Sequence, residues 1–332
     1  MSNEIDIREN DILKRDTALL ETLLVDHSRP KNGKKPAHII WATDNYEPLD
    51  KALYGESNEI TIEAITGEHG EVIQPRVKKT KIEQQSRARD KGEVFTPSWI
   101  CNNQNNLVDS AWFGKNGLFN EEIPEGWRTN RTPIPFPNNK GQNWLDYVAD
   151  PRLEITCGEA PYLISRYDTI TGEIIPVLDR VGLLDRKLRV VAENTHDPKE
   201  WFDAVVIAYQ SIYAYEWQGD NLLLARENAL YTFDDYYKEK FGGCPSKEQA
   251  RIIADIISWN FWQMDGLKGV IPNSCHEDCH TEVNLFGDEK TEVLKCPGCE
   301  QERIDLHNGI YCKVKDWTTG KTVKYISLIK TR

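Results

Sequence analysis

Two pairs of cysteines near residues 275 to 299 have the types and spacing of a metal site. The first pair is separated by three residues, and sixteen residues later a Cys-Pro-Gly-Cys turn supplies the second pair. Two turns that each carry two thiolates build a tetrahedral zinc site. His276 and His280 adjoin the first pair, so that one of them could replace a cysteine. We expect a structural Zn²⁺, with free thiols as the alternative, on Cys275, Cys279, Cys296 and Cys299.

A second candidate for chemistry is the segment Leu153–Leu163, which reads Leu-Glu-Ile-Thr-Cys-Gly-Glu-Ala-Pro-Tyr-Leu. A strand that ends in small residues lets a ligand approach the backbone, and a helix that follows offers free N–H groups. In an open α/β sheet, a nucleotide-like ligand lies at such a strand end. The segment therefore predicts a ligand site.

Four segments in order resemble the amino-methyltransferases that act on adenine in DNA and use S-adenosylmethionine. Leu153–Leu163 resembles their first motif, and Gly92-Glu-Val-Phe-Thr-Pro97 is similar to the segment that precedes their cofactor domain. Residues 212–222 (Ile-Tyr-Ala-Tyr-Glu-Trp-Gln-Gly-Asp-Asn-Leu) resemble the second motif, and residues 257–267 (Ile-Ser-Trp-Asn-Phe-Trp-Gln-Met-Asp-Gly-Leu) the third. Together these segments cover residues 92 to 267.

The resemblance implies a Rossmann-like, doubly wound α/β domain that binds S-adenosylmethionine. Glu216 would accept hydrogen bonds from the ribose hydroxyls, which suits a carboxylate, and Asp265 would face the adenine amino group. The interval of 62 residues from Glu154 to Glu216 implies an insertion at about 167–199, opening with a hairpin, and Glu159 and Ala160 depart from the small residues usual there. The implied cofactor-binding residues are Phe95, Thr96, Pro97, Glu154, Cys157, Gly158, Glu216 and Asp265.

The catalytic motif of these enzymes, an Asn or Asp followed by Pro-Pro and an aromatic residue, has no counterpart, because the sequence contains no Pro-Pro pair. Asp316-Trp317 is the only polar-aromatic pair near its expected place, and the sequence ends at Arg332. The catalytic residues are therefore unknown. We expect a subunit or half of a restriction–modification DNA adenine-N6 methyltransferase whose second chain supplies the motif. The alternatives are an inactive fold relative that binds DNA or regulates a partner, and an acidic DNA mimic.

The net charge of the chain and its distribution limit how the protein could bind DNA. Lys and Arg number 41 against 53 Asp and Glu, and 41 − 53 = −12 argues against a protein that coats nucleic acid. One segment of this acidic chain is instead rich in basic residues. We expect this segment either to contact DNA phosphates or to be a solvated helix face. Its basic residues are Arg76, Lys78, Lys79, Lys81, Arg87 and Arg89.

The remaining elements must position these residues. Residues 11–26 have helical periodicity, 59–73 alternate as a hairpin, and 118–143 are rich in Pro, Asn and Gly, as a loop is. Alternating strands and helices from 152 to 267 predict an α/β domain with a mostly parallel sheet. We divide the chain into an α+β extension (1–90), a methyltransferase-like domain (91–270), a zinc-ribbon-like module (271–312) and a C-terminal strand segment (313–332). Without a signal-like N-terminus or long apolar run, we expect a cytoplasmic protein.

Overall fold

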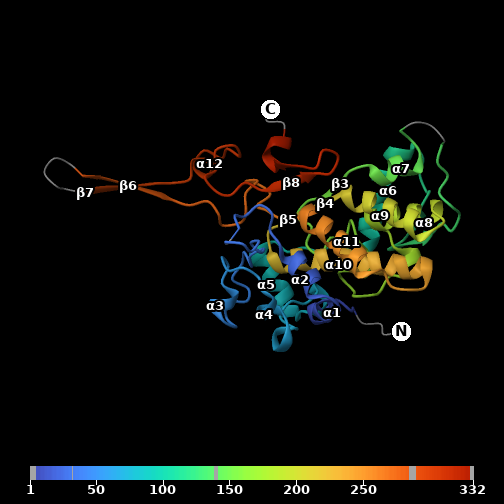
Figure 1. The fold of residues 1–332 in the computed structure, drawn as a ribbon, viewed down its shortest axis with the longest axis horizontal. Helices are drawn as coiled ribbons and strands as arrows, with labels where there is room; N and C mark the ends of the chain where they lie inside the picture. The colour runs from blue at the N-terminus through green and yellow to red at the C-terminus, as the bar shows by residue number, and fades with distance from the viewer. Residues whose placement is uncertain (1–4, 32, 138–140, 284–288, 330–332) are drawn as a thin grey trace.

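The computed structural model describes residues 5–31, 33–137, 141–283 and 289–329. The fold is mixed α/β: a small parallel sheet lies beside a layer of helices, and a long hairpin projects from the body (Figure 1). No helix in these ranges is both long enough and apolar enough to cross a membrane.

The central sheet has three parallel strands in the order β3 (Arg152–Glu154), β4 (Ile212–Glu216) and β5 (Phe261–Gln263). Arg152 is paired with Ile212, and Ala214 with Phe261. Two helices separate each pair of strands: α8 (Leu183–Asn194) and α9 (Pro198–Gln210), then α10 (Gly219–Phe241) and α11 (Lys247–Asn260). The parallel sheet within an α/β region matches the sequence prediction, and the strands all end at one edge.

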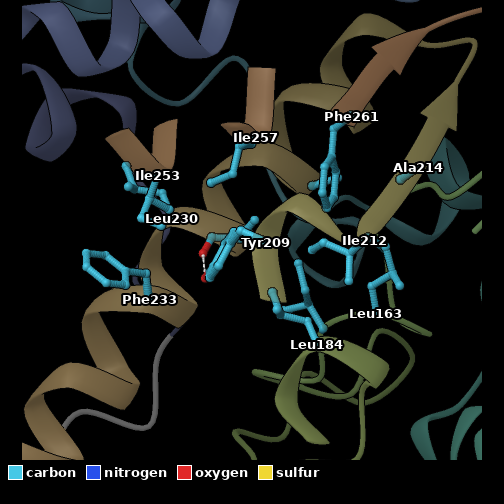
Figure 2. Packing of buried hydrophobic residues seen from close by; sticks show 14 of the residues in the cluster. Leu163, Leu184, Tyr209, Ile212, Ala214, Leu230, Phe233, Ile253, Ile257 and Phe261 are labelled. Atoms are coloured by element: carbon cyan, nitrogen blue, oxygen red, sulfur yellow. Dashed lines mark hydrogen bonds between the residues drawn. The ribbon is translucent and has the colours of Figure 1, made fainter. Parts of the chain in front are cut away.

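The main hydrophobic core lies between the sheet and these helices. Ile212 and Ala214 of β4, Phe261 of β5, and Ile253 and Ile257 of α11 all belong to this core (Figure 2). The buried Tyr209 hydroxyl donates to the Ala229 carbonyl at 2.8 Å, which satisfies its polar group. The same core includes residues from Ile5 to Leu24, so the N-terminal region packs on this layer.

The other face of the sheet has a smaller core, formed with non-helical segments. Tyr215 and Trp262 pack there with Val314 of β8 (Lys313–Asp316) and with Ile40. β8 pairs with β9 (Lys321–Lys324), which leads into the 3₁₀ turn η4 (Tyr325–Leu328). None of the residues in this cluster belongs to an α-helix. The prediction of a doubly wound sheet is therefore wrong for the described residues, because successive crossovers that advance in one direction place their helices on one face.

The N-terminal region is helical where a hairpin was expected. Thr61 accepts a hydrogen bond from the amide of Ala64 and caps a one-turn helix, α4 (Ile62–Ile65), so the alternation from residue 59 does not form a strand. In place of strands, the described part has isolated bridges, such as Ile40 with Glu59. Its other helices are α1 (Glu9–Arg15), α2 (Thr17–Leu24), α3 (Lys51–Tyr54), α5 (Lys81–Lys91) and the 3₁₀ turns η1 (Gly67–His69) and η2 (Arg76–Lys78).

The segment between α5 and β3 contains α6 (Ser98–Phe113), a hairpin of β1 (Asn120–Ile123) and β2 (Gly126–Thr129), and α7 (Trp144–Ala149). The expected insertion opens with a bridge between Tyr167 and Ile174, followed by the 3₁₀ turn η3 (Val177–Asp179). After β5, the strands β6 (Asp278–Val283) and β7 (Glu289–Leu294) form the projecting hairpin, and α12 (Pro297–Glu300) lies at its base (Figure 1).

Candidate ligand cavity and metal centre

A cavity of about 660 Å³ lies at the carboxyl ends of β3 and β4. This volume is within the range of small-molecule sites. Its walls come from the N-terminal region at Ala42, Thr43 and Glu56, the segment after α5, the loop after β3, the turn between β4 and α10, and the segment that follows β5. Six of the eight predicted cofactor residues line it: Phe95, Thr96, Glu154, Cys157, Gly158 and Glu216.

The loop after β3 has a strained backbone. Thr156, Gly158 and Ala160 have φ values of 46°, 54° and 62°, and only the second is a glycine. A β-branched residue at positive φ is an outlier, and such strain is concentrated at ligand-binding sites. A Cβ at Gly158 would also lie 3.2 Å from the Phe95 ring, so the absence of a side chain lets this aromatic residue approach the loop.

Two buried carboxylates hold this loop in place. Glu216 accepts from the Gly158 amide at 2.8 Å and from the Gln218 amide at 3.1 Å. Glu154 accepts from the Leu163 amide at 3.0 Å. Burial is the main cause that raises the pKa of both groups, to about 8 for Glu154, which also feels the charge of Glu216.

The ionisable side chains that line the cavity are mostly carboxyls. Its acids are Glu56, Glu93, Glu154 and Glu216, and Lys91 is the one basic residue among the described lining residues. The Lys91 ammonium lies 2.6 Å from Asp44, so its charge is already neutralised by a partner. Glu93 is likewise paired with Arg87, and burial raises the pKa of Glu154 and Glu216, so these carboxyls act mainly as hydrogen-bonding groups. The described lining residues offer no unpaired cation to a phosphate.

A buried ionic network supports the wall that contains Glu93. Arg87 donates to Glu93 at 2.7 Å and to Asp220 at 2.6 Å, and the Lys79 ammonium lies 3.6 Å from Asp220. Burial acts to raise the pKa of Asp220, but these two cations lower it below its usual range. The network fixes the start of α10 against the segment that leads to Phe95.

This network corrects part of the predicted DNA-binding surface. Arg87 is buried, and the side chain of Lys79 is 7% exposed, so neither is available to DNA phosphates. Arg76 stacks over the Phe95 ring at 5.2 Å, and Lys78 donates to the Ile5 carbonyl. The two exposed members are Lys81 and Arg89, and Arg89 is paired with its neighbour Asp90.

Two predicted cofactor residues lie outside the cavity lining. Asp265 follows β5, but it accepts from the Leu267 and Lys268 amides and so closes its own turn. Pro97 precedes α6 and lines a different hollow. Conversely, the sequence interpretation missed two lining residues with positive φ, Ala42 at 60° and Asn273 at 57°. Both reach the cavity through tertiary packing, which no local motif signals.

The cysteine cluster forms a candidate metal centre of a different composition from the one predicted. The sulfurs of Cys275, Cys296 and Cys299 lie 3.5, 3.5 and 3.7 Å from Nδ1 of His307. These four ligand atoms lie within 4.8 Å of one another. Three thiolates and one imidazole are a known tetrahedral zinc set, so this group can hold a metal ion such as Zn²⁺.

Local backbone geometry lets the ligands converge. Cys296 is the N-cap residue of the short helix α12, and its sulfur accepts from the Asn308 amide at 3.3 Å. A Cβ at Gly298 would lie 2.6 Å from His307, so the turn needs a glycine there. The tight Cys-Pro-Gly-Cys turn predicted from the sequence is therefore present.

Cys279 is not part of this centre. It lies exposed on β6 of the projecting hairpin, and His307 supplies the fourth ligand atom. His276 is exposed and lies 3.4 Å from Asp278, and the side chain of His280 lies outside the described part. The only sequence signal for His307 was its place eight residues after Cys299, before Asn308-Gly309.

No protein-family model, curated protein or solved structure matches this chain.

Proposed function

We propose that this chain binds S-adenosylmethionine and serves as the cofactor-binding part of a DNA adenine-N6 methyltransferase. One observation carries the proposal: an acidic cavity at the carboxyl ends of two adjacent parallel strands is lined by most of the residues that the motif resemblance selected. Ligands of open α/β sheets bind at this edge.

The cavity suits a cationic nucleoside. The Gly158 amide donates to Glu216 Oε2 and the Gln218 amide to Oε1, and each oxygen can accept a further hydrogen bond, so this carboxyl is well placed to accept from ribose hydroxyls. A sulfonium cation would be attracted by those lining carboxyls that are ionised, and the described lining residues have no unpaired cation for the phosphates of other adenine nucleotides. When bound, the cofactor supplies an electrophilic methyl group. Phe95 and the Gly158 backbone would position it.

The acceptor for the target amine is proposed to come from a second chain. Asp316 accepts from the Thr318 amide, and Trp317 donates to Asn260 at 2.8 Å, so this pair is engaged away from the cavity lining. In the described residues β3 is an edge strand, and its Leu153 is 47% exposed. A partner strand added parallel to β3 would end at the cavity, where an amine acceptor is needed. DNA remains the proposed substrate on the motif resemblance.

Calorimetry of the purified chain with S-adenosylmethionine tests the cofactor assignment. Glu216→Ala should weaken binding roughly 10- to 150-fold, since a charged hydrogen-bonding acceptor contributes about 1.5–3 kcal/mol. Glu216→Gln, which keeps the shape and one acceptor oxygen, should fall in between. Glu239→Ala, on the exposed far end of α10, is the control and should bind normally. Tight ATP binding, or equal affinity in Glu216→Ala, would contradict the proposal.

A further inference from the structure

The cavity and the metal centre share one short segment of chain, residues 271–276. Asn273 lines the cavity in a left-handed conformation, and two residues later Cys275 is a member of the metal centre. The two sites are therefore joined through Ser274. Only one residue separates a member of the cavity wall from a member of the metal centre.

Hydrogen bonds connect the segment to the chain around His307. Ser274 Oγ donates to the Ile271 carbonyl at 2.7 Å and accepts from the Ile310 amide at 3.0 Å. The Asn308 side chain accepts from the His276 amide at 3.2 Å and donates to the His276 carbonyl at 2.8 Å. The segments that carry Cys275 and His307 are therefore hydrogen-bonded to each other at Ser274 and at His276, the two neighbours of Cys275.

These two segments of the chain pack closely against each other. A Cβ at Gly309 would lie 2.6 Å from Ser274 Oγ and 3.1 Å from Cys275 Sγ. Apolar burial anchors the beginning of the segment, at Ile271 and Pro272, whereas Asn273 is exposed and Cys275 is half-buried. The hydrogen bonds of Ser274 and Asn308 hold the end of the segment. A metal ion on Cys275 would hold it further, because a structural metal contributes folding free energy to the loops that it joins.

We propose that the Cys3His metal centre positions Asn273 at the cavity, so that metal binding and ligand binding are thermodynamically coupled. The proposal concerns regulation of the same cavity, and it takes the identity of the ligand from the proposed function. Linkage is reciprocal: the factor by which Zn²⁺ tightens S-adenosylmethionine binding is the factor by which the ligand tightens Zn²⁺ binding. Typical couplings amount to about 5- to 150-fold.

Two measurements on the full chain test the coupling. Calorimetry compares S-adenosylmethionine binding to zinc-loaded and chelator-treated protein, and we expect at least about fivefold weaker binding without zinc. Hydrogen exchange compares the same two states, and we expect lost protection at residues 271–274 and in the loop 155–158. Asn273→Ala should retain one zinc per chain but show weaker binding and a smaller zinc effect. Cys279→Ser, a cysteine outside the centre, should behave as wild type.

The outcomes separate this proposal from the assignment of the ligand. Equal affinity in the zinc-loaded and zinc-free states would overturn the coupling while leaving the cofactor assignment intact. If S-adenosylmethionine binds in neither state, the cofactor assignment fails and hydrogen exchange alone decides. Unchanged protection of both segments after zinc removal would then overturn the coupling, and lost protection in both would support it.

Discussion

The carboxylate of Glu216 accepts a hydrogen bond from the Gly158 amide at 2.8 Å across 58 residues of sequence. This bond joins the end of β4 to the strained loop after β3, so the two strand ends form one wall of the cavity. The contact depends on the left-handed backbone of Gly158 and on the space that its missing side chain leaves for Phe95.

Gly158→Ala should lower the free energy of unfolding by about 1–3 kcal/mol. A left-handed L-residue costs roughly 1–2 kcal/mol, and the new methyl group would crowd the Phe95 ring. Gly242→Ala is a matched control, because Gly242 has φ of 74° but no atom within 4 Å of the added Cβ. Urea denaturation of both variants separates backbone strain from crowding. Equal losses would show that the contact with Phe95 is unimportant for stability.

Arg87→Ala should destabilise the protein by roughly 3–5 kcal/mol, since it leaves the carboxylates of Glu93 and Asp220 without their buried guanidinium partner. Arg89→Ala, a change at an exposed side chain in the same helix, should stay within about 0.5 kcal/mol. Thermal unfolding of both variants measures this. Normal stability of Arg87→Ala together with weaker DNA binding would show that Arg87 contacts DNA and does not stabilise a buried ionic network.

The sequence indicates residues whose role is local and misses those whose partners are remote. Glu154, Gly158 and Glu216 were predictable because each stands at a strand end in a short motif. The acids that neutralise Arg87 lie up to 133 residues away, so its burial had no local sign. His307 was missed because Cys279, only four residues after Cys275, offered the nearer fourth ligand. The second face of the sheet was mispredicted because nothing local to the strands specifies what covers it.

Replacement of one ligand should separate the two possible metal sets. His307→Ala should lower the zinc content of purified, reduced protein well below one equivalent, whereas Cys279→Ser should keep one equivalent. Gly298→Ala should also weaken zinc binding, because its Cβ would lie 2.6 Å from the His307 ring. Plasma emission spectroscopy gives the stoichiometry. Zinc loss in Cys279→Ser but not in His307→Ala would restore the four-cysteine set.

Glu9→Gln should stabilise the protein at alkaline pH. Burial, aided by the charge of Glu71, raises the pKa of Glu9 from 4.5 to about 8, and the buried Glu227 nearby has its pKa raised for the same reason. The folded state retains a proton that the unfolded chain releases, so this contribution to stability is complete below pH 4.5 and is lost as pH rises to about 8.

Urea unfolding of Glu9→Gln between pH 5 and 9 checks this. Between about pH 5 and pH 8, the free energy of unfolding of Glu9→Gln should fall less steeply with pH than that of the wild type, by about 1.4 kcal/mol per pH unit. Glu239→Gln, an exposed substitution on α10, should leave the pH profile unchanged. Parallel profiles for wild type and Glu9→Gln would show that Glu9 is solvated in the folded protein.

The pH dependence of ligand binding should reveal the charge of the cavity. Burial raises the pKa of Glu154 to about 8, so this lining residue is largely neutral at pH 6.5 and ionised at pH 9. Ionisation adds a negative charge near a cationic ligand. The affinity for S-adenosylmethionine should therefore rise by up to about tenfold, about 1.4 kcal/mol, across this range.

S-adenosylhomocysteine is the control ligand, since it lacks the sulfonium charge but has the same amino-acid group. The ratio of the two affinities thus isolates the sulfonium, and its slope should be lost in Glu154→Gln. A ratio that is constant with pH in the wild type would show that Glu154 does not contribute to recognition of the cation.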